Sequence, residues 1–312
     1  MYCNFALIDD EFLSLFAPDE QNKIKDTVYA YYLQCGRDKS KKLSMEHYFS
    51  SSHVKYKFVY TYCPKCKKSG ILLFPFKKSG LSDLKYCAHC GESNISHRFS
   101  TGLEKIDAMI SVSELLTGLK YKKAARDVNQ QIATLIISVF EVYLRDCYAG
   151  ILNTKYVNEH NTLFDKFIKE CKNDFLNPGK ANERFKKELK IDFKNGVGKD
   201  TFKKLVELAE YRNVIVHNNG ICDKKFLLLN IGNYNLHDTI NLSHEEINYY
   251  LQAVKDTIQY LDMEYRNIIN SHIAESLKLK IATGAPDLMA VYVHRTMKSP
   301  IVLTAVKPRN KE

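Results

Sequence analysis

The chain has 312 residues, of which 45% are apolar and 26% charged, so disorder is excluded and one large or two modest domains are possible. Its formal net charge is +10 at pH 7, which favours anionic partners. Acidic residues at positions 9–11 stand where a signal peptide would be apolar, and no apolar run reaches the ~20 residues that span a bilayer. We therefore expect a cytoplasmic protein with no membrane association.

Residues 1–52 form an N-terminal segment with a weak pattern and a net charge of −2, from six basic and eight acidic residues. Pro18 and the two acidic residues after it are typical of a helix start, and Gly36 is a natural end. One face of this helix would carry Ile24, Val28, Tyr31 and Cys35. We assign this segment no chemistry.

Residues 53–100 contain two C-x-x-C pairs that are separated by twenty residues: Cys63, Cys66, Cys87 and Cys90. Each pair can turn two thiolates toward one point, and two pairs complete a tetrahedron that suits Zn²⁺. Alternating side chains over 54–62 and the apolar run 71–76 predict two strands beside the cysteines. This arrangement resembles a zinc ribbon, a small β-rich domain whose closed metal site is structural. Iron in a rubredoxin-like site and a redox dithiol are the alternatives.

The same segment has a net charge of +7, from nine basic and two acidic residues. Its lysines alternate with tyrosine and phenylalanine, so cations could meet phosphates while rings stack on bases. The alternative is that the tyrosines pack internally and the lysines only solubilise the domain. The candidates for nucleic-acid contact are Lys55, Lys57, Lys65, Lys67 and Lys68.

From residue 101 to 275 the apolar residues follow helical spacing. They predict one long helix over 122–148, a second over 164–175, a third with Asp200 as its N-cap, and a fourth that starts at a Ser243–Glu246 capping box. Four such helices with short connections describe a bundle. Residues 276–312 form a C-terminal extension in which 285–306 make a short element.

The third predicted helix ends with Arg212, Asn213 and His217, a set of side chains suited to phosphate chemistry. RNA is cleaved without a metal when its 2′-hydroxyl attacks the adjacent phosphate. His217 can transfer protons, Arg212 can stabilise charge on the phosphoryl oxygens, and Asn213 can position either group. Asn213 also belongs to an expected buried stripe with Phe202, Leu205, Val206, Ala209 and Val216, where an unpaired amide would be costly.

Helix geometry places Asn213 and His217 on one face, whereas Arg212 is offset from His217 by about 140° around the axis. One helix therefore does not easily direct both Arg212 and His217 at one phosphate, but a two-fold dimer could. The ordinary alternative is a surface histidine beside an arginine that serves only in an ion pair.

The Arg-Asn-x3-His motif and the surrounding four-helix pattern resemble the HEPN superfamily of helical ribonuclease domains. The resemblance covers about residues 103–270. It implies a mainly α fold and a metal-independent endoribonuclease that leaves 2′,3′-cyclic phosphate ends. It further implies a composite site at a homodimer interface and a role as a toxin or antiphage-defence effector, restrained by an antitoxin or held in a larger complex. A non-catalytic scaffold or antitoxin whose ribbon binds nucleic acid or protein is the alternative.

Two further acidic residues are weaker candidates for supporting the motif. Glu210 precedes it in the sequence, and Glu141 interrupts the long apolar helix. Arg145 follows Glu141 by four residues, so an exposed ion pair is the simplest account of Glu141.

Overall fold

The computed structural model of the chain describes residues 5–8, 10–35, 44–50, 56–66, 69–75, 87, 90, 93, 95–155, 171, 173–282, 290–296 and 299–306. The chain is mainly helical, as predicted, and it divides into two compact units. The first unit is Met1–Asn94 together with Arg266–Glu312, and the second is Ile95–Tyr265. The predicted N-terminal segment and the predicted ribbon up to residue 94 belong to the first unit, whereas residues 95–100, which the prediction placed in the ribbon, begin α4 in the second unit. Within the described ranges, no helix has the length and apolar character that crossing a bilayer requires.

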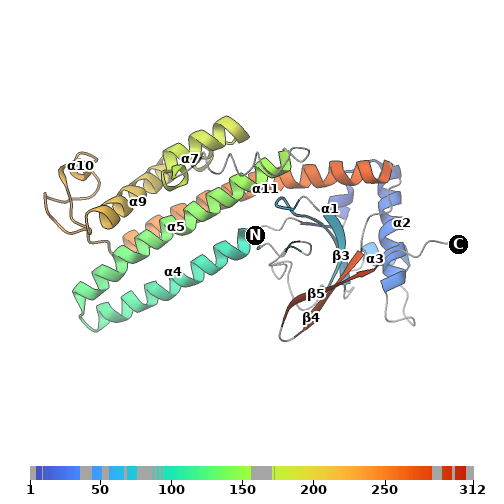
Figure 1. The fold of residues 1–312 in the computed structure, drawn as a ribbon, viewed down its shortest axis with the longest axis horizontal. Helices are drawn as coiled ribbons and strands as arrows, with labels where there is room; N and C mark the ends of the chain where they lie inside the picture. The colour runs from blue at the N-terminus through green and yellow to red at the C-terminus, as the bar shows by residue number, and fades with distance from the viewer. Residues whose placement is uncertain are drawn as a thin grey trace. The chain divides into compact units, whose positions relative to one another are not determined.

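The first unit contains a five-stranded sheet in the order β1-β2-β3-β4-β5 (Figure 1). Its strands are β1 (Phe5–Leu7), β2 (Tyr56–Tyr62), β3 (Ser69–Pro75), β4 (Ala290–Thr296) and β5 (Ser299–Val306). Neighbouring strands are antiparallel except β3 and β4, which run parallel. The strand pair predicted beside the first two cysteines is therefore part of a larger sheet that also includes the C-terminal extension.

Three helices of the first unit follow β1: α1 (Asp10–Leu13), α2 (Pro18–Cys35) and α3 (Met45–Ser50). The start of α2 agrees with the sequence pattern, because Glu20 accepts a hydrogen bond of 3.0 Å from the backbone N–H of Ala17. On the predicted apolar face, Ile24 and Val28 are buried. The ring of Tyr62, at the end of β2, lies 4.6 Å from the ring of His272.

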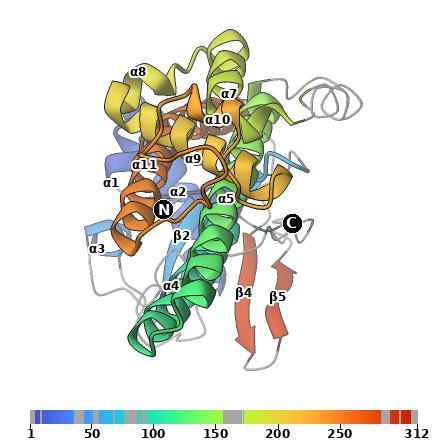
Figure 2. The ribbon, with the colours of Figure 1, turned by 90° about the vertical axis from the view of Figure 1, so that its left-hand side faces the viewer.

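The second unit is built from four long helices, with α5 between α4 and α9 (Figures 1 and 2). They are α4 (Ile95–Gly118), α5 (Lys122–Lys155), α9 (Lys199–His217) and the first part of α11 (His244–Ala282). Shorter elements connect α5 to α9 and α9 to α11: η2 (Asp174–Leu176), α7 (Pro178–Arg184), the π-helical turn η3 (Phe185–Leu189), α8 (Phe193–Val197) and α10 (Lys224–Leu227). A helical bundle is consistent with this arrangement.

Helix α5 is the centre of the second unit, because its apolar face is buried along the whole length. The predicted members of that face include Ile132, Ile136 and Phe140, which are fully buried. Close approach to α11 is possible at Gly150, where an added Cβ would lie 2.8 Å from the ring of Tyr265. The hydroxyl of Tyr143 donates to the carboxylate of Asp262 on α11.

Two details of the helix prediction differ from the structure. Helix α4 was not predicted, because its apolar side chains surround the helix instead of following one face. Asp200 is not the N-cap of α9, since Gly198 occupies that position with a φ of +86° and turns the chain out of α8. The predicted helix over 164–175 lies largely outside the described residues.

The capping box predicted at the start of α11 is confirmed. The Ser243 N–H donates to Glu246 at 2.7 Å, and the Glu246 N–H donates to the Ser243 hydroxyl at 3.2 Å.

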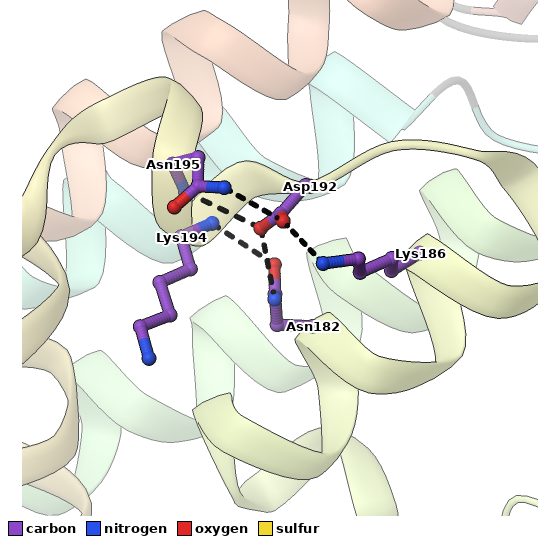
Figure 3. A network of polar contacts seen from close by, with 5 residues as sticks. All are labelled: Asn182, Lys186, Asp192, Lys194 and Asn195. Atoms are coloured by element: carbon purple, nitrogen blue, oxygen red, sulfur yellow. Dashed lines mark hydrogen bonds and ion pairs between the residues drawn. The ribbon is translucent and has the colours of Figure 1, made fainter.

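A polar network around Asp192 joins α7 to α8 (Figure 3). The Asp192 carboxylate accepts hydrogen bonds from Lys186 at 3.0 Å and from the side chain of Asn182 at 3.1 Å. It also accepts from the backbone and side chain of Asn195, and so caps the start of α8. The interaction with Lys186, followed by that with Asn182, lowers the pKa of Asp192.

We predict that Asp192→Ala lowers the free energy of unfolding by about 1–2 kcal/mol at pH 7, because it removes a helix cap and leaves the buried Asn182 amide without its acceptor. A carboxyl whose folded-state pKa is depressed stabilises the fold above its unfolded pKa. The difference should therefore shrink as the pH falls below about 4.

Urea denaturation followed by far-UV circular dichroism at several pH values measures this effect. The matched control is Glu183→Ala, which removes an exposed carboxylate from α7. A loss that is equal in both variants, or that does not depend on pH, would contradict this role of Asp192.

Candidate functional sites

The Arg-Asn-His motif lies on the last two turns of α9, an unbroken helix that ends at His217. His217 is exposed, whereas Arg212 and Asn213 are half-buried. Because the helix is regular up to its end, Asn213 and His217 share one face and Arg212 is turned about 140° away from His217. Within one chain, the three side chains are therefore not directed at one point.

Weak contacts connect the half-buried members of the motif. A guanidinium nitrogen of Arg212 lies 3.4 Å from the side-chain oxygen of Asn213, and the Asn213 amide lies 3.4 Å from a carboxylate oxygen of Glu210. Both distances are long for N–H···O hydrogen bonds. The Nε of Arg212 is buried and finds no hydrogen-bond partner among the described residues.

The expected buried stripe of α9 is wrong at three of its six positions, Val206, Asn213 and Val216. Val206 and Val216 are 36% and 44% exposed, and Asn213 between them is half-buried. The buried face instead passes from Leu205 and Ala209 to a second set, Tyr211, Val214 and Ile215. Asn213 therefore does not lie in an apolar core, and its face with His217 is open to solvent.

The chain leaves α9 through a tightly bonded turn. The carbonyl of Val214 accepts from the backbone N–H groups of Asn218 and Gly220, at 2.9 and 3.1 Å. The side chain of Asn218 donates to Asp223 at 2.8 Å, and Asp223 caps α10. The bond from the backbone of Phe226, then that from Asn218, lowers the pKa of Asp223. The C-terminal side of the motif is thus well ordered.

Gly220 is required by this turn for two reasons. Its φ is +75°, a conformation that favours glycine, and a Cβ there would lie 2.7 Å from the Gln130 side chain of α5. Gln130 in turn donates to the carbonyl of Ile240 at 2.7 Å, and Asn129 donates to the carbonyl of Leu242 at 2.8 Å. Two neighbouring amides of α5 therefore hold the end of the segment that leads from the motif into α11.

Tyr211 anchors this segment to the bundle. Its ring is buried and packs against Phe226, Tyr234 and Tyr250 with centroid distances of 5.6, 6.3 and 5.8 Å. Burial raises the pKa of the Tyr211 hydroxyl, which favours its protonated form. From the sequence, Tyr211 was a weak candidate for supporting the motif, as Glu210 was, whereas Gln130 was given no part, although a polar pair at 129–130 within an apolar helical face was a visible signal.

The structure also pairs a serine with a histidine, at Ser113 and His244, whose Oγ and Nε2 atoms lie 2.8 Å apart. Ser113 has no exposed surface, and its hydroxyl lies 2.5 Å from the Asn129 side-chain oxygen, to which it donates. A nucleophile must reach its substrate, and the buried hydroxyl of Ser113 cannot. We therefore assign the pair a structural role, in which it joins α4 to α5 and to the start of α11.

Of the two acidic candidates, only Glu210 contacts the motif, through Asn213. Glu141 is half-buried, and in the described part of the chain no ion pair joins it to Arg145 and no hydrogen bond joins it to the motif. The expected surface pair with Arg145 is thus not formed.

The four predicted cysteines come together in the first unit. Their sulfur atoms all lie within 4.8 Å of one another, with 3.8 Å between Cys63 and Cys90 and 3.9 Å between Cys66 and Cys87. A tetrahedron of thiolates at the Zn–S distance of about 2.3 Å has S···S edges of about 3.8 Å. The cluster could therefore hold a metal ion such as zinc, and its spacing fits four ligands better than disulfides.

The lysines predicted to contact nucleic acid are only partly described. Lys65 lies in the turn between Cys63 and Cys66 and is exposed. Lys57 is in β2, opposite Phe74 in the register with β3. Three further candidates lie outside the described residues: Lys55, Lys67 and Lys68.

Comparison of the chain with protein-family models, curated proteins and solved structures found no match.

We predict that Gly220→Ala lowers the free energy of unfolding by about 1–3 kcal/mol, because it combines an unfavourable φ with a collision against Gln130. Gly118→Ala is the matched control, since a Cβ at Gly118 meets no atom within 4 Å. Thermal unfolding of the two variants compares them directly. Equal unfolding temperatures for the two variants would contradict the predicted destabilisation at Gly220.

We predict that the purified protein carries a stoichiometric metal ion, with zinc favoured by sulfur ligands, and that Cys63→Ser loses it. The control is Cys222→Ser, which changes a buried cysteine outside the cluster. Inductively coupled plasma mass spectrometry of the dialysed proteins measures the content. Full metal retention by Cys63→Ser, or equal loss from both variants, would contradict the site.

Proposed function

We propose that the protein is a metal-independent endoribonuclease of HEPN type, active as a homodimer with a composite site formed by two copies of Arg212, Asn213 and His217. The main support for the proposal is the exposure and hydrogen bonding of His217 and Arg212 within one chain. His217 is exposed and makes no hydrogen bond with a described residue, while Arg212 is held half-buried with an unsatisfied Nε. Unsatisfied buried donors are uncommon and are found at sites that bind a ligand or ion.

The proposed reaction balances without a metal or cofactor. The 2′-oxygen of RNA attacks the adjacent phosphorus, and the bond from phosphorus to the 5′-oxygen breaks. One neutral imidazole takes the 2′ proton, and the protonated imidazole of the partner's His217 gives a proton to the leaving oxygen. Arg212 stabilises the charge that develops on the phosphoryl oxygens. The products are a 2′,3′-cyclic phosphate and a free 5′-hydroxyl.

In this scheme Asn213 and Glu210 position the Arg212 guanidinium. The Asn213 amide lies between Glu210 and Arg212, so it can orient the guanidinium without adding charge. The ordered turn through Asn218 and Gly220 supports the proposal because it fixes the last turn of α9, which carries His217.

The cysteine cluster is proposed to be a structural zinc site of a zinc ribbon. Four sulfur ligands would leave no open coordination position, so the ion would stabilise the fold and take no part in cleavage. Lys65 and its neighbouring lysines would let the ribbon engage RNA or a partner. By the HEPN resemblance, the protein would act as a toxin or antiphage effector.

We predict that the purified protein cleaves mixed RNA in the presence of a chelator too weak to remove the structural ion. His217→Ala and Arg212→Ala should each lower the rate by about 100-fold or more, because each removes a group that acts in the transition state. End-group analysis by mass spectrometry should detect 2′,3′-cyclic phosphates.

The control is Asp200→Ala, an exposed position in the first turn of α9. Circular dichroism verifies that all three variants remain folded. RNA that stays intact at every protein concentration, or products with 3′-hydroxyl ends, would contradict the proposal. Intact RNA would favour the non-catalytic scaffold.

A further inference from the structure

The turn between α4 and α5 presents a second basic surface, which sequence analysis did not single out. We call residues Lys120–Lys123 the hairpin tip. It contains three exposed lysines around Tyr121, whose side chain is 62% exposed. No ion-pair partner of these lysines is found among the described residues. Backbone bonds define the turn: the Tyr121 N–H donates to Leu116 at 2.9 Å, and the Lys120 N–H donates to Thr117 at 3.0 Å.

The backbone of Lys120 is unusual for a residue with a side chain. Its φ is +65°, in the left-handed region that favours glycine. A lysine at this position costs the fold stability that glycine would not. The two backbone bonds of the turn are those of a common helix end with a left-handed residue, so this conformation fixes the shape of the tip.

A row of side chains on α5 leads from the hairpin tip to the end of the motif helix. Lys123, Arg126 and Gln130 are spaced i, i+3, i+7 and so share one face of α5. Gln130 is the residue that contacts Gly220, three positions after His217. Lys123 is seven residues from Gln130, or about 10 Å along the helix axis. Arg126 also contacts Asp127 at 3.4 Å, an exposed pair of small energy that leaves the guanidinium accessible.

We propose that the hairpin tip and the Lys123–Arg126 row bind single-stranded RNA outside the scissile bond. A strand held at His217 would run along α5 toward the tip, where Tyr121 stacks on a base and the basic side chains contact successive phosphates. Exposed aromatic rings interleaved with cations are the usual means of holding single strands without reading their sequence. The inference rests on the proposed function for the position of the scissile bond, and it adds residues that the motif does not contain.

The experiment measures binding of a fluorescent RNA of about 10 nucleotides, by anisotropy, to full-length protein that carries His217→Ala so that the RNA stays intact. Tyr121→Ala and Lys123→Glu should each weaken binding by about tenfold. Lys123→Glu should also reduce the dependence of log Kd on log salt concentration by about 0.7. A dinucleotide that spans only the scissile bond should bind all variants alike.

Two further variants separate the loss of an RNA contact from a loss of stability and from a general effect of charge. Lys120→Gly removes a charge but relieves the strained φ, so it should raise thermal stability while it weakens RNA binding. Lys187→Glu is the charge-matched control, because Lys187 is 83% exposed on η3, an element outside the α4–α5 hairpin. Unchanged RNA affinity in the tip variants, or a loss no larger than that of Lys187→Glu, would overturn the inference.

Failure of the inference and failure of the proposed function give different results. If the protein with His217 intact cleaves RNA and the tip variants cleave long substrates as well as the parent, the inference fails and the function stands. If no RNA is cleaved but binding still depends on Tyr121 and Lys123, the surface stands and the nuclease assignment fails.

Discussion

The contact between Gly220 and Gln130 is the constraint on which the geometry of the candidate site depends. It brings the backbone that leaves α9 against the side of α5, where glycine is favoured by a φ of +75° and by the 2.7 Å that would separate an added Cβ from the Gln130 amide. Gln130 and Asn129 hold the carbonyls of Ile240 and Leu242 at the α11 end of the segment, and the Ile240 N–H donates to the Gly220 carbonyl at 2.7 Å, which ties that end to the turn after the motif. His217 therefore lies at a defined place on the bundle.

The same constraint connects the motif to the basic face of α5. Because Gln130 shares that face with Arg126 and Lys123, the end of α9 meets a row of cations that continues to the hairpin tip. An exposed histidine beside a positively charged track is suited to a long anionic substrate, whereas a small substrate would need a closed pocket. This difference favours a polymer as the ligand of the proposed site.

The parts of the fold that sequence analysis predicted well are those with strong local patterns. The buried face of α5 follows helical spacing, the capping box at Ser243 is a local signal, and the cysteine pairs specify their own geometry. Helix α4 was missed because it leaves apolar side chains exposed, among them Val112 and Leu115. No single-face pattern results from such a helix.

The environment of the motif could not be predicted from α9 alone. Its N-terminal half packs its ring of Phe202 against Phe193, while its C-terminal half packs Tyr211 against Phe226 and Tyr250. The buried face rotates between these two sets of partners, which come from the elements before α9 and from the elements after it. A stripe extrapolated along one helix therefore placed Asn213 in the core, when it lies on the open face that also carries His217.

The proposed function requires two copies of His217 to act on one phosphodiester. We would determine a structure of the assembly experimentally with RNA that carries a 2′-O-methyl group at the scissile position, since that RNA binds without being cleaved. We expect both imidazoles within hydrogen-bonding distance of the same phosphodiester group, with Arg212 on its phosphoryl oxygens. RNA bound elsewhere, with the two imidazoles apart and facing solvent, would contradict it.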